Sequence, residues 1–534
     1  MRLKAVLIVL VALVFALIAV AATVPTTAST SGRAFSAVPI RPASAEALKA
    51  RGKSLRVPFP NAVNQGRKFV PGGDVVPPLV TAPTQRVLVL FVQFTNAPPG
   101  GPAARLDLAT YFDAMLFGPV YNPPEYGGAG PTDRTLHNYY AAVSYGAVDV
   151  VTLNLPSSLG WVQTGHPYEY YCQGDNGWGA YPNNAQGLVV DAVNAVDAQV
   201  DFSQYAVDGE VPNLFVVHAG TGAEWNGDPS IIWSHSWNVS AGTGLDGLVV
   251  DGVKVNNYAM MPEVGGDLTG FTGYTYGPFP PTVGVYAHEY GHVLGLPDQY
   301  DYGYESYGTS IYSLMANGSW NQWPGDWMFA GNSPSFLDAW SRYRLGFVTP
   351  VEITDTTGVT LPPAELEPVV YKMVVPFSGG KEYFLFENRQ QIGFDQGLNV
   401  YGVPAGEAVK GLAIYHVDDV VLSRNYWQPN EAENWKEFRS EGWKKAWTGE
   451  THYGISIIQA DDRWDLERGR FTAFLGDLYP GAGGVASFGS LTRPNSSSYY
   501  FWAGSAPKFG YSGVTAEDIA EDAGTITATL GFVR

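Results

Sequence analysis

Cysteine is almost absent from this chain, and its scarcity limits how the protein can be stabilised. The single cysteine among 534 residues, Cys172, excludes an intrachain disulfide, so stability must come from burial of apolar side chains and from bound ions. Basic residues are also scarce, with 31 Lys and Arg against 50 Asp and Glu, for a formal net charge of -19. This charge repels phosphate backbones and anionic lipid headgroups, so we expect no nucleic-acid partner and favourable binding of cations.

Charged residues of both signs make up only 15% of the chain, while hydrophobic residues make up 46% and aromatic residues 14%. With 62 Gly and 38 Pro, this composition is typical of a folded protein rich in strands and loops and excludes general disorder. A chain of this length is too long for one ordinary domain, so we expect two substantial cores and flanking segments.

The N-terminus combines a basic start with an apolar run. Arg2 and Lys4 precede an uncharged apolar stretch over 5–22, followed by small residues. This pattern predicts an export signal over 1–30 and a secreted, extracellular protein, without stable membrane association after the signal is removed. An uncleaved N-terminal membrane anchor is the alternative, because about 17–25 apolar residues can span a bilayer. We expect a monomer.

Three regions follow the signal. Residues 31–84 are rich in Pro, Ala and Gly with little periodicity, which is typical of a propeptide or linker. Residues 85–350 alternate strand patterns, such as one near 213–220, with helix patterns, such as one near 186–200, and predict a mixed α/β domain. Residues 351–534 carry short period-two runs between turns and predict a β-rich C-terminal domain.

The stretch VGVYAHEYGHVLGLPDQYD contains the strongest chemical pattern. We expect a helix over 283–294 that Gly295 ends. His288 and His292 then lie one turn apart on one face, so two imidazoles can bind one ion, with Glu289 beside them. Zinc in a catalytic site needs a third protein ligand and an open position for water, whose pKa it lowers to about 7.

Asp298 is the predicted third ligand. It lies ten residues after His288, and Gly295 can turn the chain back toward the ion because glycine tolerates conformations that other residues disfavour. The resulting pattern HExxHxxGxxD is the metzincin arrangement, with aspartate where histidine is commoner. Glu305, in a loop rich in Gly, Tyr and Ser, is a poor alternative ligand, and Asp301 is the nearest rival carboxylate.

Met315 fits the methionine turn that metzincins place beneath the metal, because it lies 17 residues after Asp298 in the run YSLMANGSW. A methionine that merely fills the core is the alternative. Metzincins often have a tyrosine two residues after this methionine, but here that residue is Asn317. A tyrosine that assists the oxyanion must come from elsewhere, and the sequence does not choose among Tyr300, Tyr302 and Tyr312. We expect His218 and His235 to be buried structural histidines.

The segments HEYGHVLGLPDQYD, SLMANGSW and SPSFLDAWSRYRLGF together resemble the immune inhibitor A family of secreted bacterial metallopeptidases, peptidase family M6. The resemblance extends over about residues 86 to 480. It implies a zinc endopeptidase made as a secreted precursor that acts on proteins or peptides. It also implies an α/β (α+β) metzincin-like zincin catalytic domain, followed by a β-rich, sandwich-like domain and commonly accompanied by structural calcium.

A second acidic cluster offers calcium ligands, with a solvated turn as the equally good alternative. Its members, in QADDRWDLERG and GDLYPG, are Asp461, Asp462, Asp465 and Asp477.

We therefore predict that His288, His292 and Asp298 hold zinc, and that Glu289 deprotonates the water that attacks a peptide carbonyl and hands the proton to the leaving amine. The competing hypothesis is a non-catalytic extracellular binding protein with a structural metal, in which some of the 15 Trp and 32 Tyr stack on sugars. A base beside an open metal position argues against it.

The 31–84 segment contains no cysteine, so a thiolate cannot cap the zinc in a precursor. We expect another group to keep the precursor latent. Asp74, between glycines and prolines, is the candidate, although a surface turn is the alternative interpretation.

Overall fold

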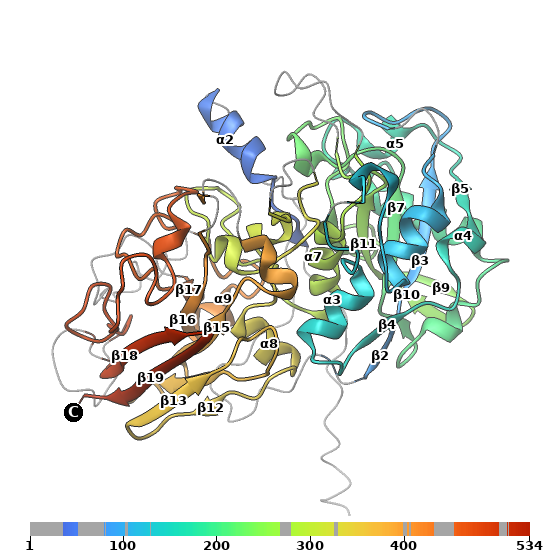
Figure 1. Cartoon of the computed structure of the whole chain (residues 1–534). Helices are drawn as coiled ribbons and strands as arrows, with labels where there is room; N and C mark the ends of the chain where they lie inside the picture. Colours follow the sequence, from blue (N-terminus) through green and yellow to red (C-terminus); the bar gives the residue numbers. More distant parts are fainter. Residues whose placement is uncertain are drawn as a thin grey trace, which may run out of the picture.

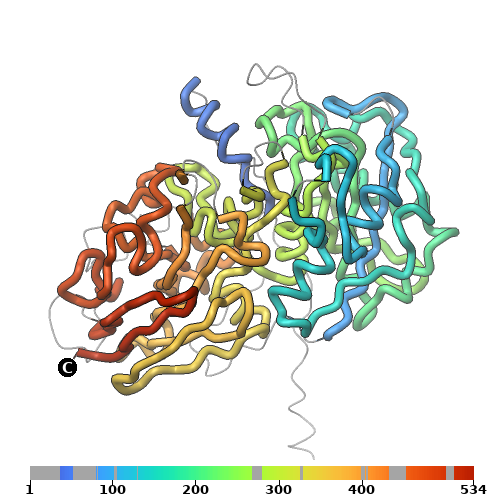
Figure 2. Tube along the Cα trace, in the orientation of Figure 1, coloured from blue at the N-terminus to red at the C-terminus, as the bar shows by residue number. Residues whose placement is uncertain are grey.

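The computed structural model describes residues 36–51, 80, 82–101, 105–128, 130–266, 279–324, 329–398, 403–404, 407–431, 453–500, 510 and 512–533. The predicted export signal and Asp74 lie outside these residues. Figures 1 and 2 show the blue-to-green half of the chain on the right and the yellow-to-red half on the left. Among the described residues, no helix combines the length and the apolar character that crossing a membrane requires.

A six-stranded mixed sheet forms the centre of the first half. The run LVLFVQ forms the buried strand β3, which pairs in parallel with β7 and β5, and β11 pairs in parallel with β7. The edge is antiparallel, because β8 pairs antiparallel with β11 and β1 antiparallel with β8. The spatial order is β1 (Ser36–Ala37), β8 (His235–Asn238), β11 (Asn257–Pro262), β7 (Leu214–His218), β3 (Leu88–Gln93) and β5 (Trp161–Gln163).

Two smaller sheets flank this one. They are β6 (Glu210–Val211), β10 (Val253–Val255) and β9 (Leu248–Val250), and β2 (Thr84–Arg86) with β4 (Asp149–Val151).

The predicted helix over 283–294 is confirmed as α7 (Val283–Leu294), and all of its residues are buried. It ends at Gly295, whose φ of 104° lies in the left-handed region that glycine tolerates. The predictions near 186–200 and 213–220 correspond to α6 (Ala185–Val196) and β7. The other helices are α2 (Pro42–Ala50), α3 (Leu136–Val143), α4 (Pro156–Leu159), α5 (Tyr168–Cys172), α8 (Ala339–Leu345) and α9 (Asp419–Arg424).

Shorter helical turns complete the chain. They are the π-helix η1 (Ala109–Phe117) and the 3₁₀ turns η2 (Pro124–Tyr126), η3 (Phe202–Tyr205), η4 (Ala223–Trp225), η5 (Ser310–Tyr312), η6 (Asn317–Trp320), η7 (Gly393–Leu398) and η8 (Phe474–Gly476).

Two further sheets form most of the second half. A five-stranded sheet has the order β12 (Val351–Glu352), β14 (Tyr371–Val374), β15 (Glu382–Arg389), β16 (Gly411–Asp418) and β17 (Ile455–Ile457). A three-stranded sheet has the order β13 (Thr357–Leu361), β19 (Thr525–Phe532) and β18 (Val514–Asp522).

Strand β15 is buried on both faces. Its period of two sends Tyr383 and Leu385 into the large core, which they share with the first half, while Phe384 and Phe386 enter a second core shared with β13, β18 and β19. The large core therefore continues past residue 350. The mixed α/β character is thus observed, whereas the division into domains, the metzincin-like plan and the sandwich-like second domain stay predictions.

Candidate metal centre and the cleft around it

The three predicted ligands converge on one point. His288 Nε2 lies 3.0 Å from His292 Nε2, and Asp298 Oδ1 lies 3.2 Å from the first nitrogen and 3.3 Å from the second. All three side chains are buried. Among the described residues, this is the only group of three or more His, Cys, Asp or Glu whose ligand atoms lie within 4.8 Å of one another.

Backbone carbonyls fix the orientation of both imidazoles. The Nδ1 atom of His288 lies 2.8 Å from the carbonyl oxygen of Leu314, and that of His292 lies 2.9 Å from the carbonyl oxygen of Leu296. Because a carbonyl only accepts, each Nδ1 carries the proton and each Nε2 presents a lone pair. This arrangement is the one that metal-binding histidines use.

Asp298 supports the same conclusion. Its Oδ2 atom accepts a hydrogen bond of 2.6 Å from the Tyr302 hydroxyl, whereas its buried Oδ1 has no hydrogen-bond partner. An orphaned carboxylate oxygen that faces two nitrogen lone pairs requires a cation. Burial lowers the pKa of His288, which favours the neutral form that binds metal. The donor set fits zinc.

Glu289 lies beside this centre in a buried position. Its Oε1 atom accepts a hydrogen bond of 3.0 Å from the backbone N–H of Val38, and its Oε2 atom is buried without a hydrogen-bond partner. Burial and the negative charge of Asp298 raise the pKa of Glu289 well above its usual value. A carboxyl group in such an environment holds a proton more readily than an exposed one.

Met315 packs directly under α7. A Cβ added at Gly291 would lie 2.5 Å from the Met315 sulfur, so a larger residue there would force the methionine side chain to move. The backbone of Met315 is held at both ends, because its N–H donates to Ser313 Oγ at 3.1 Å and its carbonyl accepts from the N–H of Gln299 at 2.7 Å. The methionine therefore lies between the histidine helix and the residue that follows Asp298.

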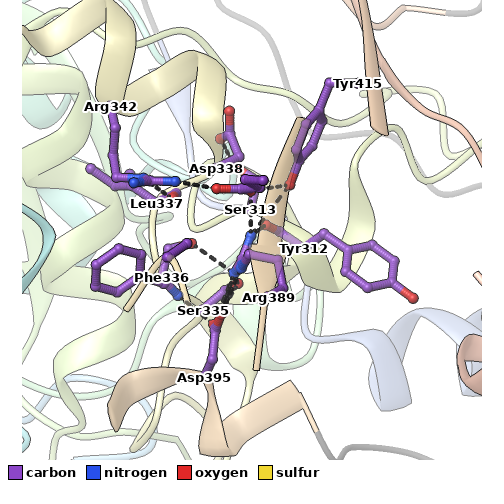
Figure 3. Close-up of polar contacts among 12 residues, drawn as sticks. Tyr312, Ser313, Ser335, Phe336, Leu337, Asp338, Arg342, Arg389, Asp395 and Tyr415 are labelled. Carbon is purple, nitrogen blue, oxygen red and sulfur yellow. Dashed lines mark hydrogen bonds and ion pairs between the residues drawn. The ribbon is translucent and has the colours of Figure 1, made fainter. Parts of the chain in front are cut away.

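A buried arginine of the second half anchors this loop (Figure 3). Arg389 in β15 donates to the carbonyl of Tyr312 at 2.8 Å and to Ser335 Oγ at 3.0 Å, while its guanidinium forms an ion pair with Asp395. Asp395 in turn accepts a hydrogen bond of 2.7 Å from the N–H of Phe336. A charge buried this deeply has to be paired, and here the pairing fixes the loop that carries Met315.

The same support continues to the ligand loop through Asp338. Its Oδ2 atom accepts hydrogen bonds from Ser313 Oγ at 2.7 Å and from Gln299 Nε2 at 3.0 Å. The sequence analysis did not identify this network. The run FLFENRQ carried a signal, because Glu387 and Arg389 lie two residues apart at the end of an apolar strand pattern and so predict a charged pair on one face.

The N-terminal strand β1 lies beside Glu289. In Figure 1 the blue segment with α2 descends from the top of the picture to α7. Side chains of the first half bind its backbone atoms from Ala37 to Ile40. The contacts are Tyr302 to the N–H and Tyr300 to the carbonyl of Ala37, Glu289 to the N–H and Trp233 to the carbonyl of Val38, Trp320 to the carbonyl of Pro39, and Tyr304 to the N–H of Ile40.

The remaining predicted residues lie apart from the metal centre. Glu305 is exposed, and Asp301 accepts backbone hydrogen bonds from Gly303 at 3.1 Å and from Ser306 at 3.0 Å. The Tyr312 hydroxyl donates to Asp477 Oδ2 at 2.9 Å, far along the chain from the ligands.

The other two histidines, His218 in β7 and His235 in β8, are buried in the sheet. Burial lowers the pKa of His218 to about 4 and that of His235 to about 3, and His235 Nε2 lies 3.0 Å from the Tyr258 hydroxyl. Neither histidine joins a ligand group within the described residues.

The four acidic residues of the second cluster do not form a ligand group of the kind that His288, His292 and Asp298 form in the described parts of the chain. Arg463 and Arg470 form ion pairs with Asp465, and burial raises the pKa of Asp477 well above its usual value. Calcium binding by Asp461, Asp462, Asp465 and Asp477 stays a prediction.

The chain matches known peptidases over about half of its length. The family model described as Immune inhibitor A peptidase M6, catalytic domain, matches residues 83–346. Immune inhibitor A from Bacillus thuringiensis subsp. alesti is 31% identical over 269 residues, which cover 44% of this chain and 36% of that protein. Pre-pro-metalloprotease PrtV from Vibrio cholerae serotype O1 (strain M66-2) is 28% identical over 296 residues, covering 49% of this chain and 30% of that protein.

The chain spans about a third of the length of these curated relatives. The match covers the region that holds α7, the three converging side chains and Met315. The resemblance inferred from the sequence is confirmed, because residues 83–346 match the catalytic domain of the M6 peptidases and are similar to immune inhibitor A and PrtV.

Proposed function

We propose that this protein is a secreted zinc-dependent endopeptidase of metzincin-like plan, with His288, His292 and Asp298 as the zinc ligands. The convergence of two Nε2 lone pairs on the orphaned Oδ1 of Asp298 is the observation that carries the proposal. Zinc held there would supply a Lewis acid for the peptide carbonyl and would lower the pKa of a bound water. The proposal of secretion rests on the basic and apolar N-terminal sequence.

In this proposal Glu289 is the general base. Its raised pKa suits a group that accepts a proton from the attacking water and then delivers it to the leaving nitrogen. The contact between Glu289 Oε1 and the N–H of Val38 supports the second step, because that N–H stands in for the leaving nitrogen of a substrate. Met315 would support the ligand helix from below.

The alternative is a non-catalytic binding protein with a structural metal. A structural site surrounds its ion with protein ligands, whereas this group offers three and places a buried carboxylate next to them. The environment of Glu289 therefore favours catalysis.

Latency is part of the same proposal. The segment over 36–51 pairs with β8 and binds Glu289 through the N–H of Val38, so we assign the inhibitory role within the predicted propeptide to this segment. The earlier candidate Asp74 lies outside the described residues. The contact through backbone atoms explains how a segment without cysteine can block the site.

The test uses the full chain with a specific-protease recognition sequence inserted after Arg51. The protein folds intact, is cut afterwards, and is incubated with denatured casein with and without a chelator. We expect chelator-sensitive hydrolysis that increases on cutting. Glu289→Gln should keep its zinc and lose activity by about two to four orders of magnitude.

Equal rates for Glu289→Gln and the parent would disprove the general base. Full zinc content without any hydrolysis in the cut parent chain would favour the binding protein instead. Equal activity before and after cutting would remove the inhibitory segment.

A further inference from the structure

One peptide group of the N-terminal segment is bound at both of its polar atoms. The carbonyl oxygen of Ala37 accepts a hydrogen bond of 2.5 Å from the Tyr300 hydroxyl, and the N–H of Val38 donates to Glu289 Oε1 at 3.0 Å. The two atoms belong to the single peptide bond between Ala37 and Val38. They stand in for the carbonyl oxygen and the leaving nitrogen of a bond that is to be cleaved.

The segment has the extended conformation that a peptidase cleft binds. Strand β1 pairs antiparallel with the edge strand β8, with Ala37 opposite His235 and Ser36 opposite Ser236. The N–H of Val38 also approaches the carbonyl oxygen of Ser234, at 3.4 Å. Ala37 and Val38 are both completely buried, so this peptide group is shielded from water. A substrate can add to the same edge in the same way.

The neighbouring tyrosines have other tasks. The Tyr302 hydroxyl donates a hydrogen bond to Asp298 Oδ2 and accepts one from the N–H of Ala37, so its role is to orient the proposed zinc ligand Asp298. The Tyr304 hydroxyl accepts from the N–H of Ile40, which lies two residues beyond Val38. The Tyr312 hydroxyl is bound to Asp477. Of these four tyrosines, only Tyr300 donates to the carbonyl oxygen of the peptide bond beside Glu289.

We propose that Tyr300 is a catalytic residue that stabilises the negative charge on the substrate carbonyl oxygen. The proposal rests on the peptidase function proposed above. When water oxygen bonds to the carbonyl carbon, the π electron pair moves onto the carbonyl oxygen, and the Tyr300 O–H bonds more strongly to that oxyanion than to the neutral carbonyl. The pair then re-forms the carbonyl as the C–N bond breaks and Glu289 delivers a proton to the nitrogen.

The first experiment measures turnover by the full chain cut after Arg51, with an internally quenched peptide as substrate and zinc content determined for each variant. We expect Tyr300→Phe to keep full zinc, to lose about 100-fold in kcat and to keep KM within about twofold. Tyr304→Phe is the matched control. It removes a hydroxyl in the same loop, and that hydroxyl binds the backbone N–H of Ile40, away from the reacting peptide bond. Any loss of activity in this variant should appear in KM.

Two results would overturn the assignment: an unchanged kcat in zinc-loaded Tyr300→Phe, or an equal fall in kcat in Tyr304→Phe. Tyr312→Phe addresses the rival hydroxyl and should leave both constants unchanged. A loss of kcat in Tyr312→Phe alone would transfer the role to Tyr312.

The second experiment measures binding and does not depend on turnover. Calorimetry compares a synthetic peptide of residues 36–51 with its analogue that carries a thioamide at the carbonyl of Ala37, whose sulfur is a weaker acceptor. The cut parent chain should bind the analogue about five- to tenfold more weakly, and Tyr300→Phe should bind the two peptides equally.

Equal binding of both peptides by the parent chain would refute the contact, even if Tyr300→Phe failed to fold. A parent chain that binds zinc but hydrolyses nothing would refute the peptidase function. The binding comparison would still report whether Tyr300 holds this carbonyl, so the two failures are distinguishable.

Discussion

The metal centre and strand β1 meet at Glu289, but they are built in different ways. The three ligands come from one stretch over 288–298 and meet through side chains. Strand β1 reaches the same carboxylate from 251 residues away and is held through its backbone. The difference teaches that the candidate ligands of this site come from one short stretch, whereas the backbone that contacts Glu289 comes from a distant part of the chain.

The largest expected effect removes a ligand from the local centre. Asp298→Ala should lose zinc and activity together, because two histidines leave the coordination incomplete. Asp298→His should retain part of the metal. Zinc content of the purified variants provides the measurement, and exposed Glu305→Ala is the control that should bind zinc normally. Stoichiometric zinc in Asp298→Ala would show that the centre is not built from this stretch.

The second prediction asks how far the local centre depends on distant support. Arg389→Met leaves Asp395 buried without its ion-pair partner, while Glu387 keeps its ion pair with Arg342, and should cost about 3–5 kcal/mol of the free energy of unfolding. The loss should loosen the Met315 loop and weaken zinc binding, measured by urea unfolding and competition with a chelator. Arg463→Met is the matched control, since its ion pair with Asp465 is half exposed and should contribute less than about 1 kcal/mol.

If Arg389→Met lowers stability but leaves zinc affinity intact, the metal centre is independent of the second half of the molecule. The contrast would then be greater, because the zinc affinity would depend only on residues close to the ligands.

The third prediction concerns Glu224, which binds Ser234 and the backbone of Arg41 next to strand β1. Burial raises the pKa of Glu224 from its usual 4.5 to about 7, and this carboxyl accepts hydrogen bonds from Ser234 while its backbone carbonyl accepts from Arg41. Between these pH values the folded state keeps a proton that the unfolded state has released. Stability therefore falls as pH rises from about 4.5 to 7, by about 1.4 kcal/mol per unit and about 3 kcal/mol in total.

Glu224→Gln should remove this contribution and flatten the dependence of the unfolding free energy on pH, measured by urea unfolding between pH 5 and 8. Exposed Glu305→Gln should keep the slope of the parent. An unchanged slope in Glu224→Gln would mean that the Glu224 carboxyl does not keep its proton in the folded state over this pH range.

The smallest expected effect lies in the N-terminal segment outside the cleft. The Tyr307 hydroxyl donates to Glu46 in α2, and Lys49 lies over its ring at 4.6 Å. Tyr307→Phe removes two partly buried hydrogen bonds, the one donated to Glu46 and the one accepted from Lys49 Nζ at 3.0 Å, so the residual activity of the uncut chain should rise about two- to tenfold. The KM of the cut enzyme for a short peptide should not change. A change in that KM would place Tyr307 in the substrate site.

The sequence was sufficient for whatever depended on spacing along one helix. His288 and His292 are one turn apart in any α-helix, and Gly295 permits the left-handed turn that returns Asp298 to them. The limits of α7 and the mixed α/β character followed from the same local patterns. Met315 could be singled out because it lies close behind the ligands in the chain.

Local pattern did not choose among Tyr300, Tyr302 and Tyr312, because their hydroxyls are chemically alike and differ only in what they face. It predicted a latency group within 31–84 and named Asp74, but it did not single out residues 36–40, since a two-residue strand such as β1 has too little pattern to indicate its partner.

What the sequence by itself determined is the donor set, because helix geometry is set by hydrogen bonds between residues four apart. What only the tertiary structure decided is which distant groups meet that set. Strand β1 adds to the edge of β8, Arg389 binds the loop before Met315, and the two faces of β15 enter different cores. Such contacts depend on the packing of the whole chain, in which buried charges must find partners and edge strands must be covered, and no local spacing encodes that choice.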